Sequence, residues 1–222
     1  MLNGNRLPTV DSWLHLGHLI HSDENSSHDL DQKRREIIGK IHSLQQELGP
    51  QDPAVFLQLV KTYVLHLYGC QLWDIFSNNT EKLWATWHRT IKIVYDLPHA
   101  THRYLLNDLV NFDHIKKLII KRFLKFSEQI RNIDVPQITF LHRIQSCDYR
   151  SVYGRNILNI LREAGSTQIS DVKLDNITIN PAPPGCEWRS HLLKDLLRDR
   201  FNSEGLLSLD ELNQIIADIC VN

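Results

Sequence analysis

The fold is decided by the stretch Ile37-Ile38-Gly39-Lys40-Ile41-His42-Ser43-Leu44-Gln45-Gln46-Glu47-Leu48-Gly49-Pro50. Its apolar residues recur at intervals of three and four, which places them on one face of an α-helix. Gly49 and Pro50 follow the pattern directly, as such residues do where a helix ends. Asp29 or Asp31 is positioned to cap the start. The stretch therefore predicts an amphipathic helix that packs on a core.

Two further helices with the same spacing follow. Asp52-Pro53 offers an N-cap and a proline at the first helical position. Thr80 is positioned to cap the next helix, and Leu97-Pro98 ends it. The faces expected to be buried are Phe56, Leu59, Val60, Tyr63, Val64 and Leu67 in one helix, and Leu83, Trp84, Trp87, Ile91 and Val94 in the other. Residues 29–97 are therefore expected to form a three-helix bundle, with Trp73, Trp84 and Trp87 as core.

Strand-like alternation precedes these helices. Apolar and polar residues alternate from Trp13 to Leu16, and Gly17 interrupts a pattern that then resumes. This predicts a bent or bulged strand. Asn3-Gly4 before it favours a β-hairpin within residues 1–28.

Helical spacing also continues beyond Pro98. Residues 98–164 are expected to be helical and to include a basic helix over residues 114–131, and Gly165 ends the last of these helices. The expected fold is mainly α: a helical bundle preceded by a short N-terminal β-hairpin and followed by a second helical region.

The C-terminal part divides by composition. Residues 165–186 are rich in Ser, Asp, Asn, Thr and Pro, which predicts a linker or long surface loop with one short strand at 177–179. Residues 187–222 predict a pair of helices, the second opened by a capping box from Ser208 to Glu211.

Charge and hydropathy limit the class of protein. The chain has 222 residues, of which 42% are apolar, enough for a packed core. Its 25 Lys and Arg nearly balance 26 Asp and Glu, so any electrostatic function must be local. Lys61 and His66 interrupt the most apolar stretch, and Met1 is not followed by a signal sequence. We expect no contact with a membrane and a location in the cytosol or nucleus.

Several motifs occur in an order known from one protein family. They are Asn3-Gly4, Leu16-Gly17-His18-Leu19-Ile20, the first helix with its cations Lys33, Arg34 and Arg35, then Tyr68-Gly69-Cys70-Gln71-Leu72-Trp73, and Leu97-Pro98-His99-Ala100-Thr101-His102-Arg103-Tyr104-Leu105-Leu106. Residues 1 to about 110 thereby resemble the segment that follows the palm in reverse transcriptases of non-LTR (LINE-type) retrotransposons. The resemblance implies the thumb and C-terminal part of an RNA-directed DNA polymerase. The family's catalytic aspartates precede these motifs, so we expect no polymerase activity and no catalytic residues in this chain.

The resemblance also implies contact with RNA or an RNA–DNA duplex. Leu16 and Gly17 correspond to the primer grip, where glycine lets the backbone approach phosphates closely. Lysines and arginines on a helix can follow a phosphate backbone, although a solvated helix face gives the same pattern. The cationic candidates are Lys33, Arg34 and Arg35 in the first helix, and Lys116, Lys117, Lys121, Arg122 and Lys125 in the basic helix.

No metal or cofactor is expected. His15, His18 and His21 are spaced at three, but on a strand His15 and His18 would point to opposite faces. The four cysteines lie far apart without a Cys-x-x-Cys pair, which is typical of buried reduced thiols.

Two alternatives to nucleic-acid binding stay open. One is a helical protein-interaction module, or an inert translated remnant of a retroelement. The other is a degenerate EF-hand over residues 200–211, in which Arg200 occupies the first ligand position and would repel calcium. Glu211 in that loop is equally explained by the capping box.

Overall fold

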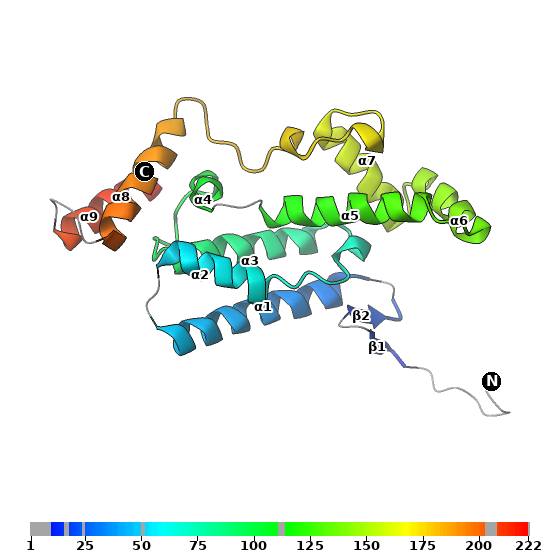
Figure 1. Ribbon diagram of the computed structural model, residues 1–222, viewed down its shortest axis with the longest axis horizontal. Coiled ribbons are helices and arrows are strands. Elements are labelled where there is room, and N and C mark those ends of the chain that lie inside the picture. The colour runs from blue at the N-terminus through cyan, green and yellow to red at the C-terminus, as the bar shows by residue number, and fades with distance from the viewer. Residues whose placement is uncertain are drawn as a thin grey trace.

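The computed structural model describes residues 10–15, 18–23, 25–49, 52–110, 114–202 and 208–221. The strands are β1 (Ser12–His15) and β2 (His18–His21), which form an antiparallel hairpin. The helices are α1 (Ser27–Leu48), α2 (Pro53–Leu59), α3 (Asn78–Val94), α4 (Arg103–Leu109), α5 (Ile115–Arg131), α6 (Pro136–Cys147), α7 (Val152–Ala164), α8 (Glu187–Asn202) and α9 (Leu209–Val221) (Figure 1). A mainly α fold with an N-terminal β-hairpin is thus confirmed.

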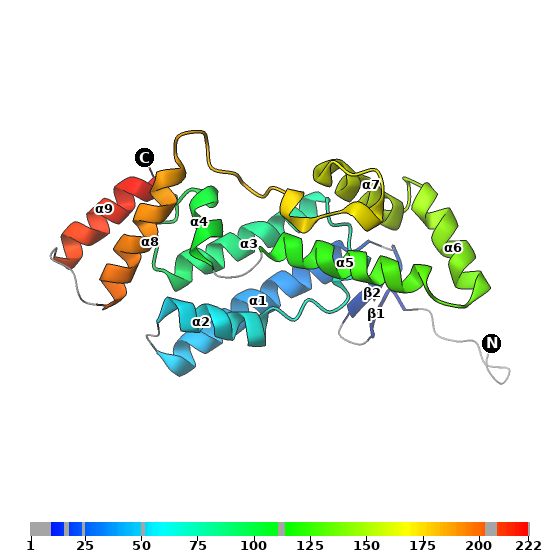
Figure 2. The ribbon, with the colours of Figure 1, turned by 45° about the horizontal axis from the view of Figure 1, so that its top comes forward.

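The core lies between α1, α3 and α5, which run side by side through the middle of the molecule (Figures 1 and 2). Trp84 and Trp87 of α3 are buried there, and Trp73 is fully enclosed, as the helical spacing predicted. Leu30, Ile37 and Ile41 from α1 and Ile115, Ile119, Ile120 and Phe123 from α5 complete the centre. Burial of these side chains is the main term that stabilises the fold.

Two buried polar side chains hold the loop between α2 and α3. Asp29 in α1 is fully buried, and its carboxylate accepts the indole N–H of Trp73 at 2.6 Å and the backbone N–H of Leu19 at 2.9 Å. From the other side, Asn156 in α7 donates to the Trp73 carbonyl and accepts the Ile75 N–H, at 2.8 and 3.0 Å. The loop therefore joins α1, α7 and the hairpin.

The hairpin differs in register from the sequence prediction. β1 and β2 are separated by Leu16 and Gly17, which lie outside the described residues, as does the expected Asn3-Gly4 turn. His15 pairs directly with His18 across the two strands, so the prediction that they point to opposite faces is wrong. The sequence pattern was interpreted as one strand, whereas directly paired residues of two antiparallel strands share a face.

Helix starts also differ in detail. Ser26 occupies the N-cap position of α1, because the Asp29 carboxylate is used in the core instead. Ser77, not Thr80, caps α3, with its hydroxyl accepting the Thr80 N–H. The α2 helix ends at Leu59 and continues as one π-helical segment, Val60–Val64, which shifts the helix face and leaves Tyr63 exposed.

The C-terminal region returns along the molecule. After α7, residues 165–186 run back over α4 and α5 to α8 (Figure 1). They form two short 3₁₀ turns, Ile169–Asp171 and Leu174–Asn176, and not the strand expected at 177–179. The α8 and α9 helices pack on each other, and the Ser208–Glu211 capping box opens α9.

Three further sequence expectations can be compared with this arrangement. Arg200, the first position of the EF-hand pattern, pairs with Asp96 in the segment after α3, and residues 203–207 of the pattern lie outside the described part. Cys70 and Cys220 are buried thiols, but Cys147 is exposed, which corrects the expectation that all four are buried. Among the described residues, no helix is long and apolar enough to cross a membrane.

Replacing Asp29 by alanine is expected to destabilise the protein by about 3–5 kcal/mol, because the Trp73 and Leu19 N–H donors lose their buried acceptor. Urea denaturation followed by tryptophan fluorescence measures the change. Asp31→Ala, which removes only a partly exposed pair with Arg34, is the control and should cost less than about 1 kcal/mol. Equal losses in the two variants would show that Asp29 has no special role.

Candidate nucleic-acid interface

The α5 helix is fixed by its apolar face. Ile115, Ile119 and Phe123 are fully buried, and the ring Nδ1 of His114 caps the helix by accepting the Lys116 N–H at 3.1 Å. With 3.6 residues per turn, these contacts set which residues face outward. The helix therefore holds its remaining side chains at fixed spacing on a rigid support.

Lys117, Lys121 and Lys125 form one row along the outer side of α5, which we call the lysine row. Successive members are four residues apart, or about 6 Å along the helix axis. Lys121 and Lys125 are exposed and Lys117 is partly buried, and within the described part of the chain none of the three forms an ion pair. Like charges at this spacing repel by a few tenths of a kcal/mol, which a bound anion would relieve.

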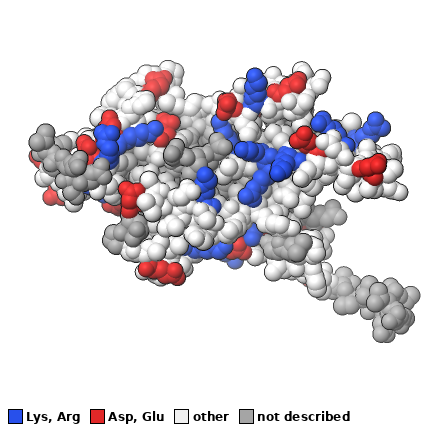
Figure 3. Space-filling model, in the orientation of Figure 1, with Lys and Arg blue, Asp and Glu red and all other residues white. Residues whose placement is uncertain are grey.

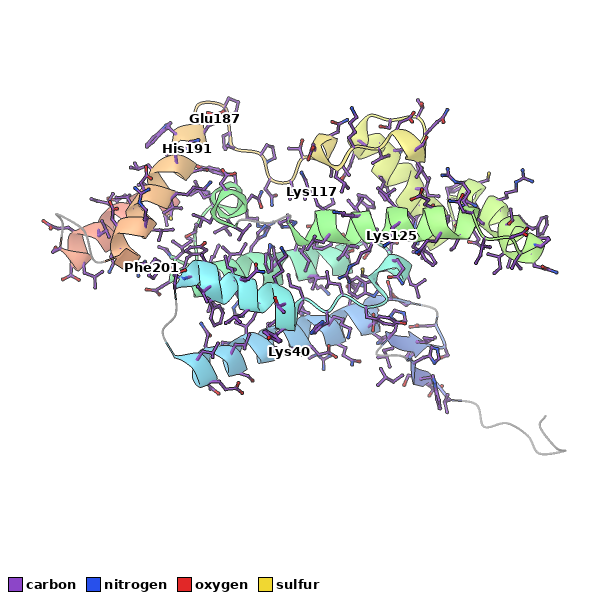
Figure 4. The ribbon with its side chains drawn as sticks, in the orientation of Figure 1. Lys40, Lys117, Lys125, Glu187, His191 and Phe201 are labelled. Atoms are coloured by element: carbon purple, nitrogen blue, oxygen red, sulfur yellow. The ribbon has the colours of Figure 1, made fainter. Side chains whose placement is uncertain are left out.

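The surface around α5 is correspondingly basic. Figure 3 shows Lys and Arg side chains gathered over α5 on the face turned to the viewer. Figure 4 places Lys117 near the start of the helix and Lys125 further along it. The row is thus a continuous feature of one helix.

Two other cations of α5, Lys116 and Arg122, have structural partners. Lys116 Nζ lies 2.8 Å from Glu163 Oε1 in α7 and 5.0 Å from the centre of the Phe76 ring. Arg122 donates to the Leu67 carbonyl at 2.7 Å. These side chains tie α5 to α7 and to the loop that follows α2, so Lys116 is not available as a free cation and Arg122 is partly occupied.

The basic group at the start of α1 is largely neutralised. Lys33 is buried and pairs with Glu36 at 3.0 Å, while Arg34 pairs with Asp31 at 3.2 Å. Arg35 is exposed, but it lines a groove together with both of these acids. The charges of this group are therefore balanced locally by Asp31 and Glu36.

A polar cavity of about 320 Å³ lies beside the start of the lysine row. Its lining includes Lys117 of α5, the N-cap residue His114, Asn107 of α4, and Asp175 from the segment before α8. The Asn107 side-chain amide donates to the Ile179 carbonyl at 2.6 Å. The cavity therefore brings together polar groups that are far apart in the sequence.

His114 also belongs to a buried pair that the sequence did not reveal. Its Nε2 lies 3.2 Å from the Nε2 of His88 in α3. Burial lowers the pKa of His88 to about 4, helped by the charges of Arg103 and Lys92. Burial likewise lowers the pKa of His114 to about 3, with His88 adding to the effect. Both rings are neutral at physiological pH, and no spacing in the sequence connects them.

A second surface is apolar. The α6 helix buries none of its residues, and Phe140, Leu141 and Ile144 are exposed by 63%, 57% and 45%. Beside it, Ile138 and Leu141 join Phe126 and Ile130 of α5 in an apolar groove of about 230 Å³. Exposed apolar area of this kind is typical of a protein contact.

No protein-family model, no curated protein and no solved structure matches this chain. Leu16 and Gly17, the expected primer-grip positions, lie outside the described residues.

Acid is expected to destabilise the protein through His88 and His114. Because both folded-state pKa values lie below the ordinary 6.5, the unfolded chain binds more protons between pH 6.5 and about 4. The free energy of unfolding should therefore fall as the pH is lowered through this window, by at most about 1.4 kcal/mol per pH unit for each ring. Urea denaturation across the window measures the slope.

His88→Gln should make this pH dependence shallower, because one of the two buried rings no longer titrates. The control is His42→Gln, which replaces an exposed ring on α1 and should leave the slope unchanged. A His88→Gln slope equal to that of the unmodified protein would contradict the assignment.

Proposed function

We propose that the protein contacts the phosphate backbone of RNA or an RNA–DNA duplex through the lysine row of α5, without catalysing polymerisation. The observation that carries the proposal is that Lys117, Lys121 and Lys125 lie at regular spacing without acidic partners among the described residues. Each lysine that neutralises a phosphate releases bound counterions, which favours association. The resemblance to a polymerase thumb supports the same substrate class.

The geometry favours contact with the backbone over reading of bases. Lysine is a flexible point charge and lacks the planar fork with which arginine recognises a base edge. Arg122, the exposed arginine next to the row, already donates to the Leu67 carbonyl. Binding is therefore expected to depend on salt and on duplex shape, with little dependence on sequence.

Replacing the three lysines by glutamine should weaken binding and reduce its dependence on salt. The slope of log K against log salt is expected to become shallower by roughly 2 to 3, about one for each lost phosphate contact. Fluorescence anisotropy with a labelled RNA–DNA hybrid over a salt series measures both quantities.

The matched control is Lys40, Lys82 and Lys194→Gln, which removes the same charge from exposed lysines in α1, α3 and α8. It should leave the slope within about one unit of the unmodified protein. Equal effects of the two triple variants would mean that net charge, and not the row, determines binding. No binding at low salt would exclude the proposal.

A second candidate function is a helical protein-interaction module. The exposed apolar residues of α6 and the adjoining groove favour it. An apolar groove with aromatic lining is the kind of surface that accepts an amphipathic helix of a partner. This function uses α6 and the C-terminal half of α5, so it does not compete with the lysine row for residues.

Without a partner, α6 is expected to open easily, because none of its side chains is buried. The exchange rate of each backbone amide is divided by the rate for an unfolded peptide of the same sequence. On this scale the amides of α6 should exchange at least about 100-fold faster than those of α3. Hydrogen exchange read by mass spectrometry measures this, with α3 as the internal reference. Equal protection of the two helices would contradict this expectation and indicate that α6 is already covered. If self-association covers it, the protection of α6 should rise with protein concentration.

A further inference from the structure

Three side chains with metal-binding atoms meet where the hairpin joins α1. His21 ends β2, Asp23 lies in the following turn, and His28 is in the first turn of α1. His21 Nδ1 lies 3.0 Å from one Asp23 carboxylate oxygen, and His28 Nε2 lies 3.2 Å from the other. The three ligand atoms all lie within 4.8 Å of one another.

We propose that His21, Asp23 and His28 bind a zinc ion that clamps the hairpin to α1. Zinc bonds of 2.0–2.2 Å in tetrahedral geometry separate neighbouring ligand atoms by about 3.4 Å. The two contacts to Asp23, each to a different carboxylate oxygen, are close to this value, and the two imidazole nitrogens lie within 4.8 Å of each other. The ion would keep one coordination position for water. This inference does not depend on nucleic-acid binding.

The donor set selects the class of metal. Two imidazole nitrogens and one carboxylate suit zinc and the other late first-row divalent ions. Magnesium and calcium prefer sites built almost entirely from oxygen atoms, so this cluster is expected to bind them poorly. The two imidazole rings are stacked, with 4.2 Å between their centroids and an interplanar angle of 22°.

Neighbouring backbone groups orient the carboxylate. The Asn25 N–H donates to Asp23 Oδ1 at 2.9 Å, and the Asn25 side-chain oxygen accepts the Ser27 N–H at the same distance. The carboxylate is thus positioned before a metal arrives, which is the usual role of such outer contacts.

The three proposed ligands are also close in sequence, and the segment that carries them is held between β2 and α1. Only eight residues span His21 to His28, so closing the site costs little chain entropy. On the inner side of the same junction, the Asp29 carboxylate accepts the Leu19 N–H of β2. A metal on the outer side would therefore add a second connection between β2 and α1.

Isothermal titration of the metal-free full chain with zinc chloride tests the proposal. We expect one zinc ion per chain and a rise in the melting temperature when zinc is added. His28→Ala and Asp23→Asn should each weaken zinc binding by at least about tenfold. Loss of a residue that only supports a metal ligand already weakens binding by about this factor. Because all three side chains are partly exposed, these variants are expected to fold, which circular dichroism checks.

His42→Ala, an exposed histidine of the same helix, is the matched control and should bind zinc as the unmodified chain does. Magnesium chloride at the same concentrations should give no heat of binding and no thermal shift. The proposal is overturned if the unmodified chain binds no zinc, or if His28→Ala and His42→Ala bind it equally. In either case the three side chains form only a hydrogen-bonded cluster at the surface.

Discussion

The arrangement of the N-terminal half depends on one buried carboxylate. Asp29 has no exposed surface, and it accepts hydrogen bonds from Trp73 and from the backbone of β2. A buried charge is tolerated only when donors surround it, so these partners must be in place for α1 to pack as it does. Apolar burial allows α1 to rotate or slide by small amounts, whereas directional bonds to two different segments allow one position. The Asp29 contacts therefore fix the hairpin on α1, and Asn156 fixes the same loop against α7 from the other side.

The cations of the α5 helix fall into two groups, those with structural partners and those of the lysine row. Its buried face and the contacts of Lys116 and Arg122 attach it to α7 and to the loop after α2. Lys117, Lys121 and Lys125 take part in neither attachment, and among the described residues they form no ion pair. The contacts that stabilise the helix thus also set the direction of the lysine row. The buried His88 and His114 pair adds to this attachment at the first turn.

Local patterns in the sequence predicted the helices well and the partners of charged residues poorly. Spacing of apolar residues identified α1, α3, α5, α7 and α9, because a helix face is a property of neighbouring residues. Asp29 looked like a helix cap for the same reason, since nothing nearby in the sequence reveals that Trp73 will reach it. Glu163 and the Leu67 carbonyl are 47 and 55 residues from the cations they bind. Without knowledge of such distant partners, Lys116 and Arg122 cannot be told apart from the lysine row, and the structure then separates the row from the cations that hold the fold together.

The nearly balanced charge of the chain limits the distance over which the lysine row can attract a partner. The chain carries a formal net charge of −1, so no long-range field draws a polyanion toward it. At physiological salt the field of three lysines extends about 8 Å, which limits it to partners already close to the surface. Affinity must then come from contact, and contact requires a surface of matching shape. The C-terminal half of α5, the hairpin and the apolar α6 lie toward one end of the molecule, while α8 and α9 lie at the other (Figure 1). Lys125 lies on the side of the hairpin and α6, whereas Lys117 lies nearer the middle of the molecule (Figure 4), so the lysine row extends from the centre toward the end that carries the apolar surface.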